Sequence, residues 1–384
     1  MAVTQGLFFA ANTDAQALQA LGKGPKIFPF GQSLTRGLGC GMDASIGERA
    51  AREDAPKIQK LFEGQDLVLF VSCLGGGSGS GASPVFAELS KRSGTLTIGI
   101  FTLPFSFEGE KRKQIAKASL EKIKDHVNAY VVIPNDAIFK IAPEHIPLRA
   151  AFSAMNRRLA ENLQGFLETL FLPGLINVDF ADVKALLEGR GKLSYLSAVT
   201  GGGSERAKTV LESVLQDPLY TYPTRGATRL LFSIAGGKDL RMSEVGEISN
   251  AIAAQNLKAK IIFGLTSNQK LHNRVRVTLF AIGCEQGKVP EKKIVKLIKI
   301  ALASNQKKKI VRPKGDTVRH LPKKKRKKVK KKQAVSAQQN PQPPEETQRR
   351  NALQVQQAID EAIEELQEKE RQWDTPAFLR YKLR

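Results

Sequence analysis

The most constraining feature of this chain is a glycine-rich run that follows an apolar segment. Residues 75–81 hold five glycines and two serines, namely Gly75, Gly76, Gly77, Ser78, Gly79, Ser80 and Gly81. The apolar segment Leu67–Val71 predicts a strand before the run, and a helix-forming segment begins after it at Pro84. Glycine lets a backbone approach a ligand closely, and amides at a helix N-terminus attract anions. The pattern therefore predicts a phosphate-binding loop rather than a flexible linker.

The spacing of these glycines excludes two common phosphate-binding motifs. A P-loop needs a lysine directly after its last glycine, whereas the first cation after this run is Lys91. The dinucleotide motif GxGxxG needs two other residues before its final glycine, and the run does not provide them.

Composition argues against several other classes of protein. The three cysteines and four histidines are scattered and show no metal-ligand spacing. The chain shows neither a charged-then-apolar signal pattern at its start nor an apolar stretch of membrane-spanning length. We therefore expect a soluble cytoplasmic protein without a disulfide framework or a structural zinc site.

The first part of the chain alternates strand-like with helix-like segments. The expected strands are Leu7–Ala11, Leu67–Val71, Leu96–Phe101 and Ala129–Ile133, and the expected helices are Gly47–Phe62, Pro84–Ser93 and Glu110–His126. Such alternation predicts an α/β fold with a doubly wound, Rossmann-like parallel sheet over residues 1–147, with ligand loops at the carboxyl ends of the strands. Residues 148–172 predict one long central helix with an apolar face.

A second, smaller α/β domain is expected over residues 191–286. Its predicted helices are Ala207–Gln216 and Met242–Gln255, and its predicted strands are Thr228–Ala235, Lys260–Leu265 and Arg276–Ala281.

A loop and a following helix, residues 173–190, connect the long helix to this domain. The loop places Asn177, Asp179 and Asp182 in an otherwise apolar stretch. A single aspartate there would be explained as a helix N-cap. Two aspartates that can converge beside an asparagine favour a catalytic role instead.

The formal net charge of +23 is concentrated near the C-terminus. Residues 306–332 contain fifteen lysines and arginines against one aspartate. We expect residues 287–352 to form a basic, largely disordered linker and residues 353–384 a helical tail. A flexible polycation associates with anionic lipid or nucleic acid, so Lys323–Lys332 is a candidate contact for either. A basic amphipathic helix expected at Glu291–Ser304 favours the membrane.

The glycine run and several other segments resemble the tubulin and FtsZ superfamily, with the FtsZ branch as the nearer match. The run is similar to the signature GGG[TS]G[TS]G of that superfamily. The other similar segments are Asn12–Leu18, Leu34–Gly39, Pro104–Gly109, Ile133–Asp136 and Pro173–Val183. Asp374–Arg380 resembles the short FtsZ tail peptide that docks on membrane-adaptor division proteins.

The resemblance implies a GTP-binding and GTP-hydrolysing protein that forms head-to-tail filaments at the bacterial division site. The residues 75–81 and Asn12 would hold the nucleotide, and Glu108 and Arg112 would contact its ribose. Phe152 would stack on the base, with Asn156 at the edge of the base. The alternative for Phe152 is a core position on the long helix, whose face is apolar.

The same resemblance implies a catalytic site shared between two subunits. Asn177, Asp179 and Asp182 would enter the pocket of the next subunit and polarise the attacking water, together with Mg²⁺. Assembly would then complete the active site and couple hydrolysis to a filament of identical subunits.

The start of the chain departs from the family pattern. The family's first strand and first nucleotide loop have no counterpart before Leu7, so we expect either an N-terminally incomplete sequence or a degenerate paralogue. Two other functions therefore stay open beside the GTPase. One is a non-hydrolysing paralogue that co-assembles with a complete FtsZ, and the other is a nucleic-acid-binding protein on this fold.

Overall fold

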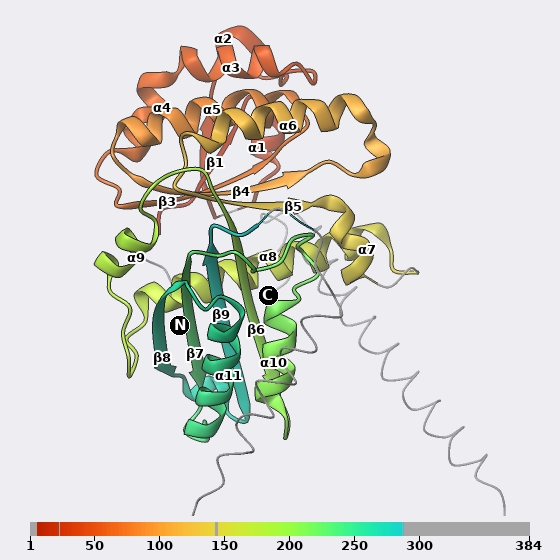
Figure 1. Ribbon diagram of the computed structural model, residues 1–384. Helices are drawn as coiled ribbons and strands as arrows, with labels where there is room; N and C mark the ends of the chain where they lie inside the picture. The colour runs from red at the N-terminus through yellow and green to blue at the C-terminus, as the bar shows by residue number, and fades with distance from the viewer. Residues whose placement is uncertain (1–5, 23, 143–144, 286, 288–384) are drawn as a thin grey trace, which may run out of the picture. The chain divides into compact units, whose positions relative to one another are not determined.

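The computed structural model describes residues 6–22, 24–142, 145–285 and 287, all of which lie within one compact unit. Strands and helices alternate through its first half (Figure 1). The helix expected at Glu291–Ser304, the lysine segment Lys323–Lys332 and the tail peptide Asp374–Arg380 lie outside the described residues. What we expect of those three segments stays a prediction.

The described chain contains the following strands and helices. The strands are β1 (Phe9–Asn12), β2 (Lys26–Pro29), β3 (Leu67–Cys73), β4 (Leu96–Leu103), β5 (Ala129–Pro134), β6 (Lys192–Gly202), β7 (Arg229–Gly236), β8 (Lys260–Ser267) and β9 (Arg274–Ile282). The α-helices are α1 (Ala15–Gln19), α2 (Gln32–Thr35), α3 (Ala44–Glu53), α4 (Ala55–Phe62), α5 (Gly77–Arg92), α6 (Glu110–Lys124), α7 (Ile138–Ile141), α8 (Leu148–Phe171), α9 (Phe180–Leu186), α10 (Arg206–Leu215) and α11 (Met242–Gln255). Short 3₁₀ turns occur at Ser106–Glu108, Asn135–Ala137 and Gln269–Leu271.

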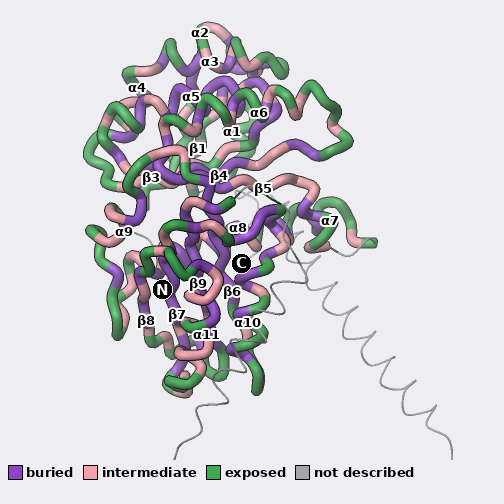
Figure 2. The backbone as a smooth tube through the Cα atoms, viewed as in Figure 1, coloured by how far each residue is buried: buried purple, intermediate pink, exposed green. Residues whose placement is uncertain are grey.

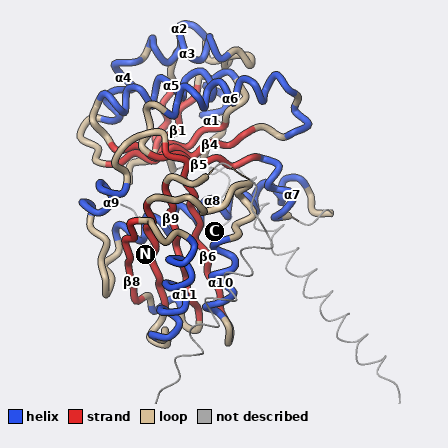
Figure 3. Tube along the Cα trace, in the orientation of Figure 1, coloured by secondary structure: helices blue, strands red, loops and turns tan. Residues whose placement is uncertain are grey.

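Seven strands form one continuous sheet in the order β3-β4-β5-β6-β9-β7-β8. Figure 3 shows the strands of the described chain in red. Strands β3, β4 and β5 are parallel, as the alternation of segments predicts. Strand β6 joins them through only two residues, Lys192 and Leu193, and then pairs antiparallel with β9. The predicted α/β class is confirmed, and the two expected domains share this sheet through β5 and β6.

A separate pair of parallel strands, β1 and β2, lies beside this sheet. Strand β2 has only four residues and ends in a proline, so its sequence does not predict it. Among the described strands, β1 pairs only with β2, and β3 pairs only with β4. The prediction about the N-terminus stays a prediction.

Two helix boundaries differ from their predictions for identifiable reasons. The helix expected at Gly47–Phe62 breaks at Asp54, because Pro56 has no N–H to continue the ladder and instead occupies the first turn of α4. The helix expected from Pro84 begins at Gly77, so Pro84 lies inside α5 and not in its first turn. Most residues of the glycine run therefore form the first turns of helix α5.

Helices cover both faces of the parallel strands, with α3, α4, α5 and α6 on one face and α8 on the other (Figure 1). A cluster that includes Ile58, Phe62 and Phe86 packs under α3–α5. The larger core lies around β4–β9 and contains Phe166 of α8. The centroids of the Phe166 and Phe280 rings are 5.1 Å apart. Figure 2 shows the central strands buried, so the polar loops at the strand ends are left for function.

Candidate functional site

The start of α5 is a ready site for an anion. Gly75 takes a φ of +107°, which favours glycine, and its amide donates to Ser80 Oγ at 2.7 Å. Gly76 is the N-cap residue, and no side chain caps the helix. The first amides of α5 therefore have no intrahelical acceptor and point toward the loop, where the helix dipole also favours negative charge.

The glycines of the run have different physical roles. A Cβ on Gly79 would lie 2.1 Å from Cys73 O, and a Cβ on Gly81 would lie 2.1 Å from Ala44 O. A Cβ on Gly77 would lie 2.9 Å from the amide nitrogen of Asp43. These three glycines let α5 pack against β3 and α3. Gly76 alone among the five has open space where its Cβ would be while keeping an ordinary φ, so it is the one placed to face a ligand.

A second glycine-rich loop, residues 36–43, meets the start of α5. Its backbone enters the left-handed region at five positions, namely Arg36, Gly37, Gly39, Gly41 and Met42. Within the described part of the chain, the amides of Cys40, Gly41 and Met42 donate no hydrogen bond. Hydrogen bonds from Ser45 lower the pKa of Asp43, which closes the loop as the N-cap of α3. Left-handed turns with free amides form concave anion sites, so this loop and α5 can share one phosphate group.

The two loops are joined by Thr13, which sequence reasoning did not single out. Thr13 is fully buried, and its Oγ1 lies 2.5 Å from Ser78 Oγ and 3.3 Å from Cys40 Sγ. Its carbonyl accepts from Gln32 and Thr35. The preceding residue, the half-buried Asn12, accepts from the amide of Asp14 at 3.2 Å. Thr13 lies within the segment Asn12–Leu18, and the resemblance of that segment to the family is the sequence signal that points to it.

The predicted ribose contacts lie next to an aromatic group. Glu108 accepts from the amide of Phe105 at 2.7 Å and forms an ion pair with Arg112. Phe105 contacts the ring of Phe152 at 5.9 Å between centroids. Phe152 is 36% exposed, so the structure does not support its reading as a core residue. Asn156 lies one turn along α8 and is also exposed.

The segment that holds Asn177, Asp179 and Asp182, called the acidic loop below, is open to solvent, in contrast to the buried Thr13. Asn177 accepts from the amide of Gly174 at 2.6 Å, and Asp179 caps α9 by accepting from the amide of Asp182 at 2.7 Å. The carboxylate of Asp182 has no partner among the described residues. All three side chains reach solvent. Asp179 therefore has a structural role as well, whereas Asp182 has a free carboxylate.

The structure places the glycine run and the acidic loop at opposite edges of the sheet. The run follows the carboxyl end of β3. Helix α9 ends beside the amino end of β5, where Asn128 donates to the carbonyls of Leu187 and Gly189, each at 3.0 Å. The two sets of predicted residues are therefore not brought together within one chain.

Two further features are absent from the described residues. No group of three or more His, Cys, Asp or Glu side chains is arranged to hold a metal ion there. None of the helices in these segments combines the length and the apolar character needed to span a bilayer.

Comparisons with known proteins match the chain to one family. A family model described as "Tubulin/FtsZ family, GTPase domain" matches residues 3–143, and "FtsZ family, C-terminal domain" matches residues 195–285. The cell division protein FtsZ of Wigglesworthia glossinidia brevipalpis is 37% identical over 75% of each chain. FtsZ 1 of Methanocaldococcus jannaschii is 40% identical over 72% of this chain and 75% of its own length.

Solved structures show the same likeness. An empty FtsZ dimer from M. jannaschii superposes with a TM-score of 0.65 at 40% identity, covering 72% of this chain and 80% of that one. CetZ1 of Haloferax volcanii, solved as a GDP-bound monomer, shares the fold with a TM-score of 0.63 at 24% identity, over 77% of this chain and 89% of its own. From its fold, its glycine-rich loop and these relatives, the chain belongs to the FtsZ family of tubulin-like cell-division GTPases.

Proposed function

We propose that this chain binds GTP and hydrolyses it at a site completed between adjacent copies in a filament at the division site. The observation that carries the proposal is the separation of the glycine run and the acidic loop at opposite edges of one sheet. Copies stacked head to tail would place the acidic edge of one against the nucleotide edge of the next. A repeated contact of that kind does not close on itself, so it yields a filament.

The nucleotide half of the site would bind the three parts of GTP with separate elements. The phosphates would lie on the amides at the start of α5, Gly76 among them, and on those of residues 40–42. Glu108 and Arg112 would contact the ribose, and Phe152 would stack on the base. Asn156 has both a donor and an acceptor, so it could pair with the edge of guanine.

The catalytic half would act on the neighbour's nucleotide. Asp182 has a free carboxylate, so we assign it the task of orienting and polarising the attacking water. Asp179 and Asn177 would hold the loop in shape through their hydrogen bonds to the backbone. Mg²⁺ usually takes one or two carboxylates plus phosphate oxygens, which suits a site of exposed aspartates facing a triphosphate. When bound, the metal would neutralise charge on the phosphates.

The proposal is tested by sedimentation and phosphate release on the full chain. We expect GTP, and not GDP, to move the protein into the pellet, with phosphate released only above the concentration at which pelleting begins. Phosphate release by the unassembled chain would contradict the shared site. Pelleting only together with a complete FtsZ, without nucleotide binding by this chain, would establish the structural-partner function instead.

A further inference from the structure

A buried carboxylate fixes the position of α8 on the C-terminal half of the sheet. Asp217 lies in the loop after α10, and its side chain has no exposed surface. Its Oδ2 accepts from Arg158 of α8 at 2.8 Å and from Ser197 of β6 at 2.7 Å. Its Oδ1 accepts from the amide of Leu219 at 3.1 Å. A buried carboxylate needs such partners, because burial without them is strongly unfavourable.

Asn162, one turn further along α8, completes the attachment to β6. Its Oδ1 accepts from the amide of Ala198 at 2.7 Å, and its Nδ2 donates to the carbonyl of Leu196 at 3.1 Å. Strand β6 pairs with β5 only at its first two residues, Lys192 and Leu193. The amide of Asn162 therefore satisfies the edge of β6 where the neighbouring strand has diverged.

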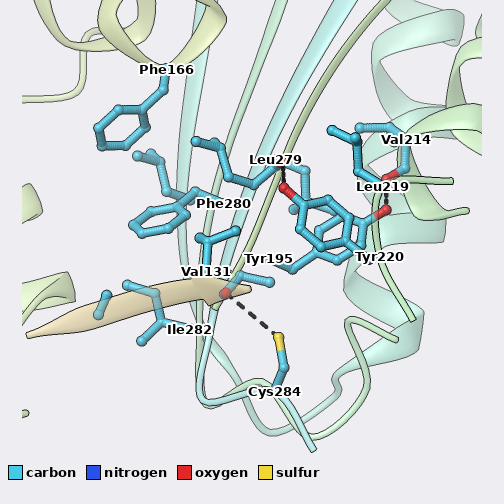
Figure 4. Packing of buried hydrophobic residues seen from close by; sticks show 14 of the residues in the cluster. Val131, Phe166, Tyr195, Val214, Leu219, Tyr220, Leu279, Phe280, Ile282 and Cys284 are labelled. Carbon is cyan, nitrogen blue, oxygen red and sulfur yellow. Dashed lines mark hydrogen bonds between the residues drawn. The ribbon is translucent and has the colours of Figure 1, made fainter. Parts of the chain in front are cut away.

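Among the described residues around Asp217, Arg158 supplies the positive charge that balances its carboxylate. The amide of Asp217 donates to Tyr195 Oη at 2.9 Å, and the rings of Tyr195 and Tyr220 lie 4.2 Å apart (Figure 4). Burial, followed by the charge of Asp217, raises the pKa of both tyrosines, so they stay neutral. Arg158 is the only side chain of the described chain that forms a salt bridge with Asp217.

These contacts bear on the nucleotide because of where they lie on α8. Arg158 follows Asn156 by two residues and Phe152 by six. A rigid helix moves as one body, so a rotation or slide of α8 at Arg158 would move both residues together. The phosphate amides, in contrast, belong to α5 and to residues 36–43 and would not move with it.

We propose that Asp217 is a positioning residue for the nucleobase, acting through Arg158 of α8 on Phe152 and Asn156. The inference rests on the proposed function, because it assigns the base to the start of α8. It separates two kinds of affinity, since Asp217 governs binding of the base and leaves binding of the phosphates unchanged.

The test compares GTP with inorganic tripolyphosphate, which lacks the sugar and the base. Asp217→Asn keeps the shape and weakens the hold on Arg158. We expect its Kd for GTP to rise about tenfold, with the Kd for tripolyphosphate unchanged and kcat preserved while KM rises. Arg158→Met should give the same pattern. The variant that combines Asp217→Asn with Arg158→Met should have a Kd for GTP no higher than that of either single variant, because both changes break the same contact.

Asp217→Leu combined with Arg158→Met is the second variant, in case the single changes prevent folding. Replacing a buried ion pair by apolar groups is often neutral for stability, yet it removes the hydrogen bonds that set the position of α8. The selective loss of GTP affinity should therefore persist. Equal weakening toward GTP and tripolyphosphate, or no change toward either, would overturn the inference. Failure of the wild-type chain to bind GTP would instead reject the proposed function.

Discussion

The two edges of the sheet are built in contrasting ways. At the carboxyl edge, the glycine run, the loop at residues 36–43 and Thr13 are joined by short side-chain hydrogen bonds, most of them buried. At the amino edge, the acidic loop is exposed and is attached mainly through backbone bonds to Leu265 of β8. Three glycines at the first edge leave no room for a side chain, whereas the second edge presents exposed apolar residues such as Leu175, which is 74% exposed.

The difference indicates what each edge needs from a partner. The carboxyl edge is formed within one chain, so it should bind nucleotide without assembly. The amino edge has a free carboxylate and an exposed apolar loop, so it gains from contact with another molecule. Changes at the first edge should therefore alter folding and nucleotide binding, and changes at the second should alter assembly and turnover.

The largest expected effect separates two glycines of the same run. Gly81→Ala should lower the free energy of unfolding by about 3 kcal/mol or more, because its Cβ would overlap the backbone of α3. Gly76→Ala should change stability by less than about 0.5 kcal/mol yet weaken GTP binding, because only this position faces open space. Urea unfolding and GTP titration measure the two quantities. An equal loss of unfolding free energy in both variants would show that Gly81 and Gly76 do not have separate roles in packing and binding.

At the amino edge, Asp182→Asn should lower GTP turnover about 100-fold, as expected for loss of a group that assists proton transfer. Its Kd for GTP should stay unchanged, because the nucleotide binds at the other edge. Helix α9 should be intact, since Asp179 supplies the cap. Glu188→Gln is the matched control, because Glu188 is an exposed acid just after the same helix. A loss of GTP affinity in Asp182→Asn would break the contrast between the edges.

A smaller effect tests how α5 accommodates its internal proline. Pro84 has no N–H for the carbonyl of Ser80, and the hydroxyl of Ser119 on α6 donates to that carbonyl at 2.7 Å instead. Ser119→Ala should therefore cost about 1–3 kcal/mol of stability by leaving a buried acceptor unpaired. The cost should shrink in a Pro84→Ala background, where residue 84 regains its N–H. Denaturant unfolding of the four proteins measures this coupling, and additive losses would contradict it.

The smallest expected effect is a loss of folding stability at low pH. Burial alone would raise the pKa of Asp54, but hydrogen bonds from Lys57 and from the amide of Gly31 outweigh it and leave the pKa below its usual value. Its contribution to stability is then complete above about pH 4 and is lost as the pH falls through the lowered value. We expect wild-type stability to fall in that acid range and Asp54→Asn to fall less. Parallel pH profiles for the two proteins would reject this role.

Sequence patterns predicted much of the fold, and the failures have physical causes. Strands β3–β5 and helix α8 were predicted because their apolar periodicity is strong. Helix α5 was expected to begin too late, because glycine disfavours helices unless close packing demands it. The packing of Gly81 against α3 depends on residues distant in sequence.

The predicted site residues show the same limit. Glycine runs and paired aspartates form local sequence patterns, so the sequence predicts a candidate role for the loop at each edge. Thr13 and Asp217 act through contacts with residues more than fifty positions away, such as Ser78 and Arg158. No local pattern marks such contacts.

The central claim is that each active site is shared by two copies, and a mixing experiment tests it most directly. Asp182→Asn keeps the nucleotide edge, and Gly76→Asp keeps the acidic edge while placing a carboxylate where phosphate would bind. In an equal mixture, about one quarter of random head-to-tail junctions would pair an intact pocket with an intact acidic loop. We predict that phosphate release by the mixture approaches a quarter of the wild-type rate, far above that of either variant alone. A rate equal to the average of the two separate variants would contradict the shared site.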